Sequence, residues 1–194
     1  MPDRLATAIA LIDEANADDP HTIVVDGVER PKEQTHAEMM TAWVTRLDPA
    51  ASEAQLLAAR AHHLRRWVVP RSSYPEGRSG YLRWRADARV RHAEEVATLL
   101  ERAGYDPATV ERVQAILRKE RLARDPAVKV HEDALCLVFF ETQAAAVGAD
   151  LGEEKAIDVV RKTLRKMSPE GRQVASGLAL PDGVHELVAR AGGW

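Results

Sequence analysis

The sequence has little from which disulfides, membrane spans or aromatic clusters could be built. Of its 194 residues, one is a cysteine (Cys136) and 5% are aromatic. This cysteine count excludes a disulfide framework and leads us to expect a reducing, cytoplasmic compartment. No run approaches the roughly 20 apolar residues of a bilayer-spanning helix. Near the N-terminus, Asp3 and Arg4 interrupt any signal-type apolar core. We therefore expect no membrane partner.

Acidic residues are scarce in the segment 65–91. Residues 65–91 contain eight arginines, no lysine and only two acids, Glu76 and Asp87, so the segment carries +6. Because the whole chain has a net charge of −3, the remainder carries −9. This asymmetry favours an anionic partner for the basic segment. A solvated helix face held by salt bridges is the alternative.

Helical periodicity and helix start signals recur along the chain, whereas strand patterns are nearly absent. We expect helices over residues 3–15, 31–47, 52–67, 81–103, 127–146, 153–167 and 184–191, with two more beginning at Pro107 and Pro169. Residues 20–31 and 70–80 are expected to be loops, and Thr22 to Val25 could form a short extended piece. The prediction is a single all-α domain, residues 1–194, of about seven to nine helices with little or no strand.

Several histidines and acids fall in or beside the apolar stripes of different helices. They are His36, one of the pair His62 and His63, His92, Glu120 and Asp133. Burying such groups without partners is unfavourable, and one metal ion could satisfy them together. Each residue alone could instead be a satisfied core histidine, and Asp133 could cap a helix or pair with an arginine. His131 and Glu132 fall on other faces and are expected to be solvated.

The order of these residues resembles the HD-domain superfamily of helical, metal-dependent phosphohydrolases. The superfamily has a first His, a His-Asp doublet and a distant Asp, and the segments that carry the resemblance read LAARAHHL (57–64) and EDALCL (132–137). The chain is also similar to the DUF4202 family in the segments RSSYPEGRSGYLRWR and ILRKERL. The resemblance implies an HD-like core over about residues 31–146, with C-terminal helices over 153–191 packed on it.

The HD resemblance implies a ligand set, which is His36, His62, His63 and Asp133. His63 stands where the superfamily has the doublet's Asp, and an imidazole cannot bridge two metals as a carboxylate can. His92 occupies one place where two-metal members have a further histidine, and Lys119-Glu120 occupies the other. Of these residues, His92 and Glu120 are the candidates for acid–base catalysis.

Such a ligand set favours Mn, Fe, Co or Zn over Mg, which prefers oxygen ligands. A bound transition metal lowers the pKa of its water to about 7, and Glu120 could accept the proton. Guanidinium and ammonium groups near the centre are candidate phosphate ligands. They are Arg65, Arg66, Arg78, Arg83, Arg85 and Lys119. Tyr81 and Trp84 could stack on a base or sugar, or pack in the core.

Three functions remain open at this point. The first is hydrolysis of a phosphorylated small molecule or nucleotide at a single transition-metal site. The second is a degenerate, non-catalytic module that binds a nucleotide or, less favoured, nucleic acid; binding to nucleic acid would weaken steeply with salt. The third is an iron-dependent oxygenase of HD type. The sequence leaves the substrate and the oligomeric state open, a homo-oligomer included.

Overall fold

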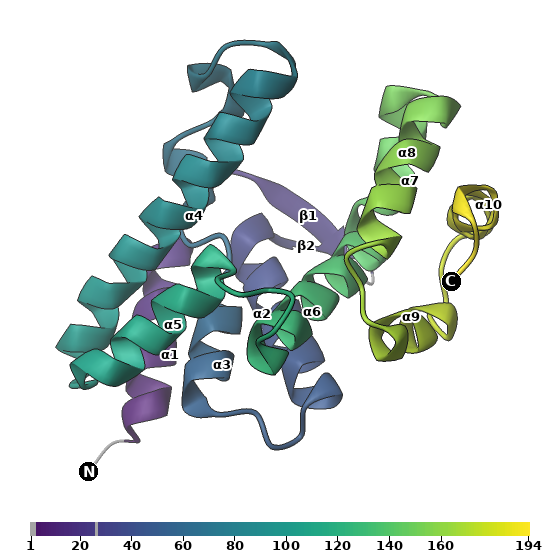
Figure 1. The fold of residues 1–194 in the computed structure, drawn as a ribbon. Coiled ribbons are helices and arrows are strands. Elements are labelled where there is room, and N and C mark those ends of the chain that lie inside the picture. Colours follow the sequence, from purple (N-terminus) through teal and green to yellow (C-terminus); the bar gives the residue numbers. More distant parts are fainter. Residues whose placement is uncertain (1–2, 26) are drawn as a thin grey trace. The chain divides into compact units, whose positions relative to one another are not determined.

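The computed structural model describes residues 3–25 and 27–194, and these form two compact units that divide after Val128. Helices dominate both units, which confirms the predicted all-α class (Figure 1). Within the described residues the one sheet is a two-stranded antiparallel hairpin. We describe each unit by itself.

The first unit contains five α-helices, the hairpin and two 3-10 turns. Its elements are α1 (Arg4–Asn16), β1 (Thr22–Val25), β2 (Val28–Pro31), α2 (Lys32–Leu47), α3 (Glu53–Arg60), η1 (Arg66–Val68), η2 (Arg71–Ser73), α4 (Gly77–Arg102) and α5 (Pro107–Arg118). Helix α3 packs on α1, α2 and α5, and α4 packs along α5 (Figure 1). The core between these helices is aliphatic and includes Ile12, Leu57, Val96, Leu100 and Ile116.

Local start signals explain where the helices of this unit begin. The Ser52 side chain accepts a hydrogen bond from Gln55 N, and the Gln55 side chain bonds back to Ser52, so a capping box starts α3. Asp106 accepts from Thr109 N, with Pro107 in the first turn of α5. Both starts agree with the sequence prediction.

The second unit contains α6, which begins at the end of the first unit, and four further helices. Its elements are α6 (Pro126–Thr142), α7 (Ala144–Leu151), α8 (Glu153–Leu164), α9 (Pro169–Ser176) and α10 (Asp182–Ala191). Helices α7, α8 and α10 pack on one another. No single helix of the described residues has the length and apolar composition of a membrane span; α6 and α7 meet that test only as a pair, bent by 62° at their junction.

The structure differs from the expected elements at four places. The expected extended piece over Thr22 to Val25 is present, but it pairs with a second strand, Val28–Pro31, that was not expected; α4 begins at Gly77 inside the expected loop, and the helix expected over 127–146 breaks at Gln143. The helix expected over 52–67 ends at Arg60. It ends there because His63 and Arg65 take left-handed conformations, with φ of 62° and 48°. The Asn16 side chain accepts a hydrogen bond from Arg65 N at 2.9 Å, so a contact with α1 overrides local helix propensity.

Candidate metal centre

The first turn of α2 presents a buried carboxylate, Glu33, which is 6% exposed. Helix α2 has no side-chain cap at its N-cap residue, Pro31. Asp19, whose side chain is fully buried, supplies one from the preceding loop: its Oδ2 accepts a hydrogen bond from Glu33 N at 2.8 Å. The other oxygen of Asp19 accepts from His21 N at 3.0 Å. Asp19 therefore fixes the backbone from which Glu33 projects.

Two histidines lie against this carboxylate. His36, three residues along α2, places Nδ1 3.5 Å from Glu33 Oε2, and His63, from the left-handed turn after α3, places Nδ1 3.2 Å from the same oxygen. One ligand atom from each of the three residues lies within 4.8 Å of the others. Glu33, His36 and His63, hereafter the triad, could hold a metal ion.

The chemistry of the triad fits a cation. The buried Nε2 of His36 makes no hydrogen bond within the described part of the chain. Buried polar atoms normally have a partner, so this nitrogen is available to bind a cation or a ligand. Burial lowers the pKa of His63 well below its ordinary value, and the positive charges of Arg66 and of the nearby histidines lower it further. A neutral imidazole is the form that binds a metal. The triad thus offers two imidazoles and one carboxylate.

A hydrogen-bonded chain without a metal is the other arrangement that these contacts allow. Arg66 donates from Nη1 to His63 Nε2, and His63 can then donate from Nδ1 to Glu33. This chain fixes the His63 tautomer and leaves both of its nitrogens used. Metal binding at Nδ1 would replace the His63–Glu33 hydrogen bond and retain the one from Arg66.

The two other histidines of the predicted site lie beside the triad. The buried His62 ring lies 3.9 Å from the His63 ring, and the His92 ring, from α4, lies 6.0 Å from it. Burial, with the charges of Arg91 and Arg66, lowers the pKa of His92 to about 4. The structure therefore brings His36, His62, His63 and His92 close together.

Glu120 differs from its expected burial. It follows the end of α5, its side chain is 49% exposed, and it lies 3.5 Å from Arg118. Helix α5 stops at Lys119, which has a φ of 59°, so Glu120 does not continue the buried stripe of Ile116. The helical extrapolation that placed Glu120 on this stripe was wrong for this physical reason. Lys119 itself contributes a positive charge that acts on His63.

Arg66 is a half-buried cation beside the triad. Its guanidinium lies 4.5 Å from the centre of the Trp84 ring, and Trp84 is held by a hydrogen bond from Nε1 to Val69 O at 2.9 Å. Burial lowers the pKa of Arg66; the Glu33 charge opposes this, and Arg85 and Arg91 add to it. Within the described residues Arg66 forms no salt bridge. Positive charge therefore exceeds negative charge at this position.

The other predicted phosphate ligands are spread out. Arg65 and Arg78 are exposed, and Arg83 is 77% exposed and lies 3.8 Å from Asp87 on its own helix. Arg85 is half-buried, with its guanidinium 5.7 Å from the centre of the Tyr81 ring. Arg91 was not among the predicted ligands, although its charge acts on both Arg66 and His92.

Asp133 belongs to the second unit, where it holds the N-cap residue of a helix, Ser168. Its Oδ1 accepts a hydrogen bond from Ser168 N at 2.8 Å, and its Oδ2 accepts one from Ser168 Oγ at 2.6 Å. Ser168 in turn caps α9, and a Cβ added at Gly171 would lie 2.6 Å from Asp133 Cγ. Burial raises the pKa of Asp133, although the bonds from Ser168 act against this. The capping alternative describes these contacts, and a ligand role for Asp133 stays a prediction.

His131 and Glu132 were expected to be solvated, and that was wrong. Each is 2% exposed, and Lys166 Nζ lies 3.9 Å from Glu132 Oε1. Helix α6 is surrounded on more sides than an amphipathic pattern implies, so adjacent residues on different faces are all buried.

Sequence reasoning missed two residues of the site, Glu33 and Asp19. A signal for Glu33 existed, since it stands three residues before His36 and so shares its helix face. Nothing local marks Asp19, because its partner, Glu33 N, is 14 residues away.

The fold and the triad define a helical protein with a candidate metal centre of two histidines and one glutamate. The chain belongs to the DUF4202 family: the model of this family, described as a domain of unknown function, matches residues 6–188. No curated protein matches the chain, and no solved structure does.

Proposed function

We propose that the protein is a metal-dependent hydrolase that acts on a phosphorylated small molecule or nucleotide at a single transition-metal site. The observation that carries the proposal is the convergence of His36 and His63 on the buried carboxylate of Glu33. Two imidazoles and a carboxylate are a ligand set of catalytic zinc sites, which keep a position open for water. Mn, Fe and Co also accept these ligands, so the identity of the metal is left to experiment.

The chemistry that such a metal supplies is a water with a pKa of about 7, hence a nucleophile at neutral pH. His62, which the HD resemblance adds as a ligand, remains a proposed member of the set. For Asp133, whose two oxygens accept hydrogen bonds from Ser168, we propose a structural role instead. His92 and Glu120 remain the proposed acid–base residues, and of these His92 lies next to the triad. Its low pKa, about 4, keeps it neutral at pH 7, so that one ring nitrogen can accept a hydrogen bond.

The anionic part of the substrate follows from the arginines. Arg66 lies beside His63, lacks a salt bridge within the described residues, and is fixed in place by Trp84. A buried cation with no carboxylate partner is stabilised when an anion binds. A phosphate held by Arg66, with Arg85 nearby, would lie next to the metal. We propose four further phosphate contacts, Arg65, Arg78, Arg83 and Lys119. The three arginines are weaker candidates because they are exposed, whereas the charge of Lys119 acts on His63.

An iron-dependent oxygenase, the third of the functions considered from the sequence, is supported by the same ligand set, because two histidines and one carboxylate are also the ligands of non-haem iron(II) oxygenases. Strict iron dependence with oxygen uptake would identify it. A non-catalytic binding module, the remaining alternative, would bind phosphorylated ligands without turning them over.

The test is elemental analysis of the purified protein, followed by reconstitution with Mn, Fe, Co or Zn and a screen of phosphorylated metabolites and nucleotides. We expect about one transition metal per chain, and phosphate release that requires it. Arg66→Gln should weaken substrate binding and leave metal content unchanged, whereas the matched variant Arg102→Gln, at the exposed last residue of α4, should change neither. No metal after reconstitution would refute the proposal. Metal with oxygen uptake would select the oxygenase, and ligand binding without turnover would select the binding module.

A further inference from the structure

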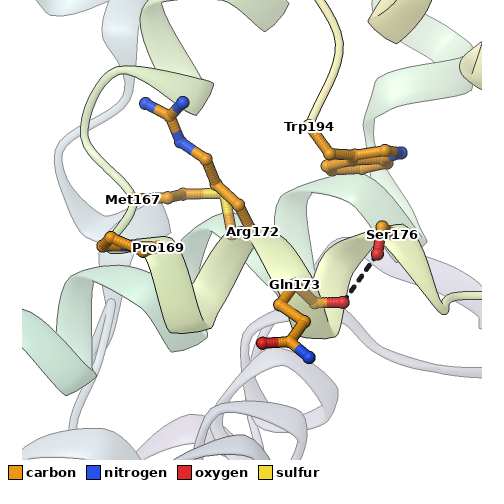
Figure 2. Close-up of a pocket in the computed structure, with 6 residues that line it drawn as sticks. All are labelled: Met167, Pro169, Arg172, Gln173, Ser176 and Trp194. Carbon is orange, nitrogen blue, oxygen red and sulfur yellow. Dashed lines mark hydrogen bonds between the residues drawn. The ribbon is translucent and has the colours of Figure 1, made fainter.

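A pocket of about 560 Å³ lies in the second unit, on one side of α9 (Figure 2). It is lined by Met167, Pro169, Arg172, Gln173, Ser176 and Trp194. Its volume falls within the range of pockets that hold small organic ligands. None of these residues belongs to the triad or to the arginines around it.

One wall of the pocket is the indole ring of Trp194, and a tight backbone turn positions it. Gly192 and Gly193 both have left-handed conformations, with φ of 117° and 76°, which side chains other than glycine rarely adopt. The turn is closed by a hydrogen bond from Gly193 N to Val188 O at 3.0 Å. It brings the Trp194 ring edge-on to the buried Phe140 ring, at 5.0 Å between centroids. The indole therefore has a fixed place in the pocket wall.

The facing wall combines apolar surface with one cation. Figure 2 shows the side chains of Met167 and Arg172 together, across the pocket from Trp194 and Ser176. Arg172 donates from Nε to Leu164 O at 3.0 Å, which fixes the side chain at its base. Its terminal nitrogens form no salt bridge within the described residues, and no acid lines the pocket. The Ser176 hydroxyl donates a hydrogen bond to Gln173 O at 2.7 Å, so its proton already has an acceptor within the protein.

We infer that this pocket binds a small aromatic acid, with the ring between Trp194 and Met167 and the carboxylate on the Arg172 guanidinium. An indole face and a thioether attract a flat aromatic group. A guanidinium with two terminal nitrogens available matches a carboxylate in two-pronged geometry. The inference does not depend on the metal centre, since no residue is shared.

The test uses 1-naphthoate and its neutral isostere 1-naphthamide, titrated into the full-length protein. Binding is followed by the indole N–H resonance of Trp194, assigned with Trp194→Phe. We expect a saturable shift of this resonance, and naphthoate binding about tenfold tighter than naphthamide binding. Arg172→Gln should abolish this preference. Trp194→Ala removes the resonance, so its binding is measured by isothermal titration calorimetry, and it should bind both ligands more weakly. Arg165→Gln, an exposed arginine outside the pocket, is the matched control and should change neither.

Two results would overturn the inference: no saturable shift of the Trp194 resonance, or an unchanged preference for naphthoate in Arg172→Gln. Because Arg172 also bonds Leu164 O, Arg172→Lys serves as a second variant that keeps the charge, and it should retain part of the preference. Glu33→Gln should bind naphthoate like the wild type. Loss of binding in Glu33→Gln would place the ligand at the metal centre and refute a separate site.

Discussion

Two regions of the molecule each bury an acidic residue of a helix, Glu33 of α2 and Asp133 of α6, yet the two carboxylates have different surroundings. In the first unit, the Glu33 carboxylate faces the imidazoles of His36 and His63. In the second, both oxygens of Asp133 accept hydrogen bonds from Ser168 at the start of α9. A carboxylate whose acceptors are used by backbone and hydroxyl groups stabilises a helix start. A carboxylate that faces neutral imidazoles provides ligands for a cation.

The surroundings of the two regions extend this difference. Beside the triad, two non-glycine residues, His63 and Arg65, have left-handed backbones, and Arg66 is a cation without a salt bridge among the described residues. Unfavourable conformations and unbalanced charge are frequent at functional sites. Around Asp133, the neighbouring Glu132 lies near Lys166, and Lys129 donates a hydrogen bond to the carbonyl of Lys166. In the second region these charged groups therefore have partners, as is usual where a buried acid has a structural role.

The largest effect is expected for Glu33→Gln, which should weaken transition-metal binding by at least about 100-fold, because the amide cannot replace the negative charge at the triad. Competition with a chelator of known affinity measures the change. Glu38→Gln, on the same helix but in salt bridges with Arg30 and Arg60, is the control and should bind metal normally. Equal metal affinity in Glu33→Gln and the wild type would remove the difference between the two regions.

Asp133→Ala should lower the free energy of unfolding by about 2–3 kcal/mol, since Ser168 N and Oγ lose their acceptor. Metal content should stay at the wild-type level. Chemical denaturation and elemental analysis on the same preparation measure both. Loss of metal from a folded Asp133→Ala protein would make Asp133 a ligand, as the HD resemblance implies.

Asp125 offers a third kind of carboxylate, paired with an arginine. Arg112 donates to both of its oxygens, at 2.5 and 2.9 Å, and this contact lowers the pKa of Asp125 from 3.8 to about 2. A lowered carboxyl pKa stabilises the folded state above the unfolded value, and the effect disappears as pH falls through the folded value. Asp125→Asn should therefore lower the free energy of unfolding by about 1 kcal/mol at pH 7.

The same difference should persist down to about pH 4 and vanish near pH 2. Urea titrations of the wild type and Asp125→Asn at a series of pH values test this. A difference that grows below pH 4 would show that the pair does not act as described.

The smallest effect is expected for Arg83→Ala. Its side chain is 77% exposed and its one ion pair is at 3.8 Å, so the free energy of unfolding should change by less than about 0.5 kcal/mol. Metal content should also be unchanged. Thermal unfolding at low and high salt is the measurement, and a large loss of stability would mean that the start of α4 depends on this residue.

Periodicity and start signals predicted most of the helices, because these depend on residues a few positions apart. Ser52, Asp106-Pro107 and Ser168-Pro169 begin helices in the structure as the sequence predicts. The ends were less predictable. The helix expected to reach residue 67 ends at Arg60, three residues before the left-handed His63, and α5 ends at Arg118, just before the left-handed Lys119. Neither of these left-handed residues is a glycine.

The sequence by itself determined the all-α class, most helix starts, and the presence of histidines on buried faces. Only the tertiary structure decided which of them meet. His63 reaches Glu33, 30 residues away, because Asn16 holds the turn that carries His63 and Asp19 holds the first turn of α2. Such contacts join α1, the loop before the hairpin and the segment after α3. They depend on how these elements pack, and a local pattern contains no information about that.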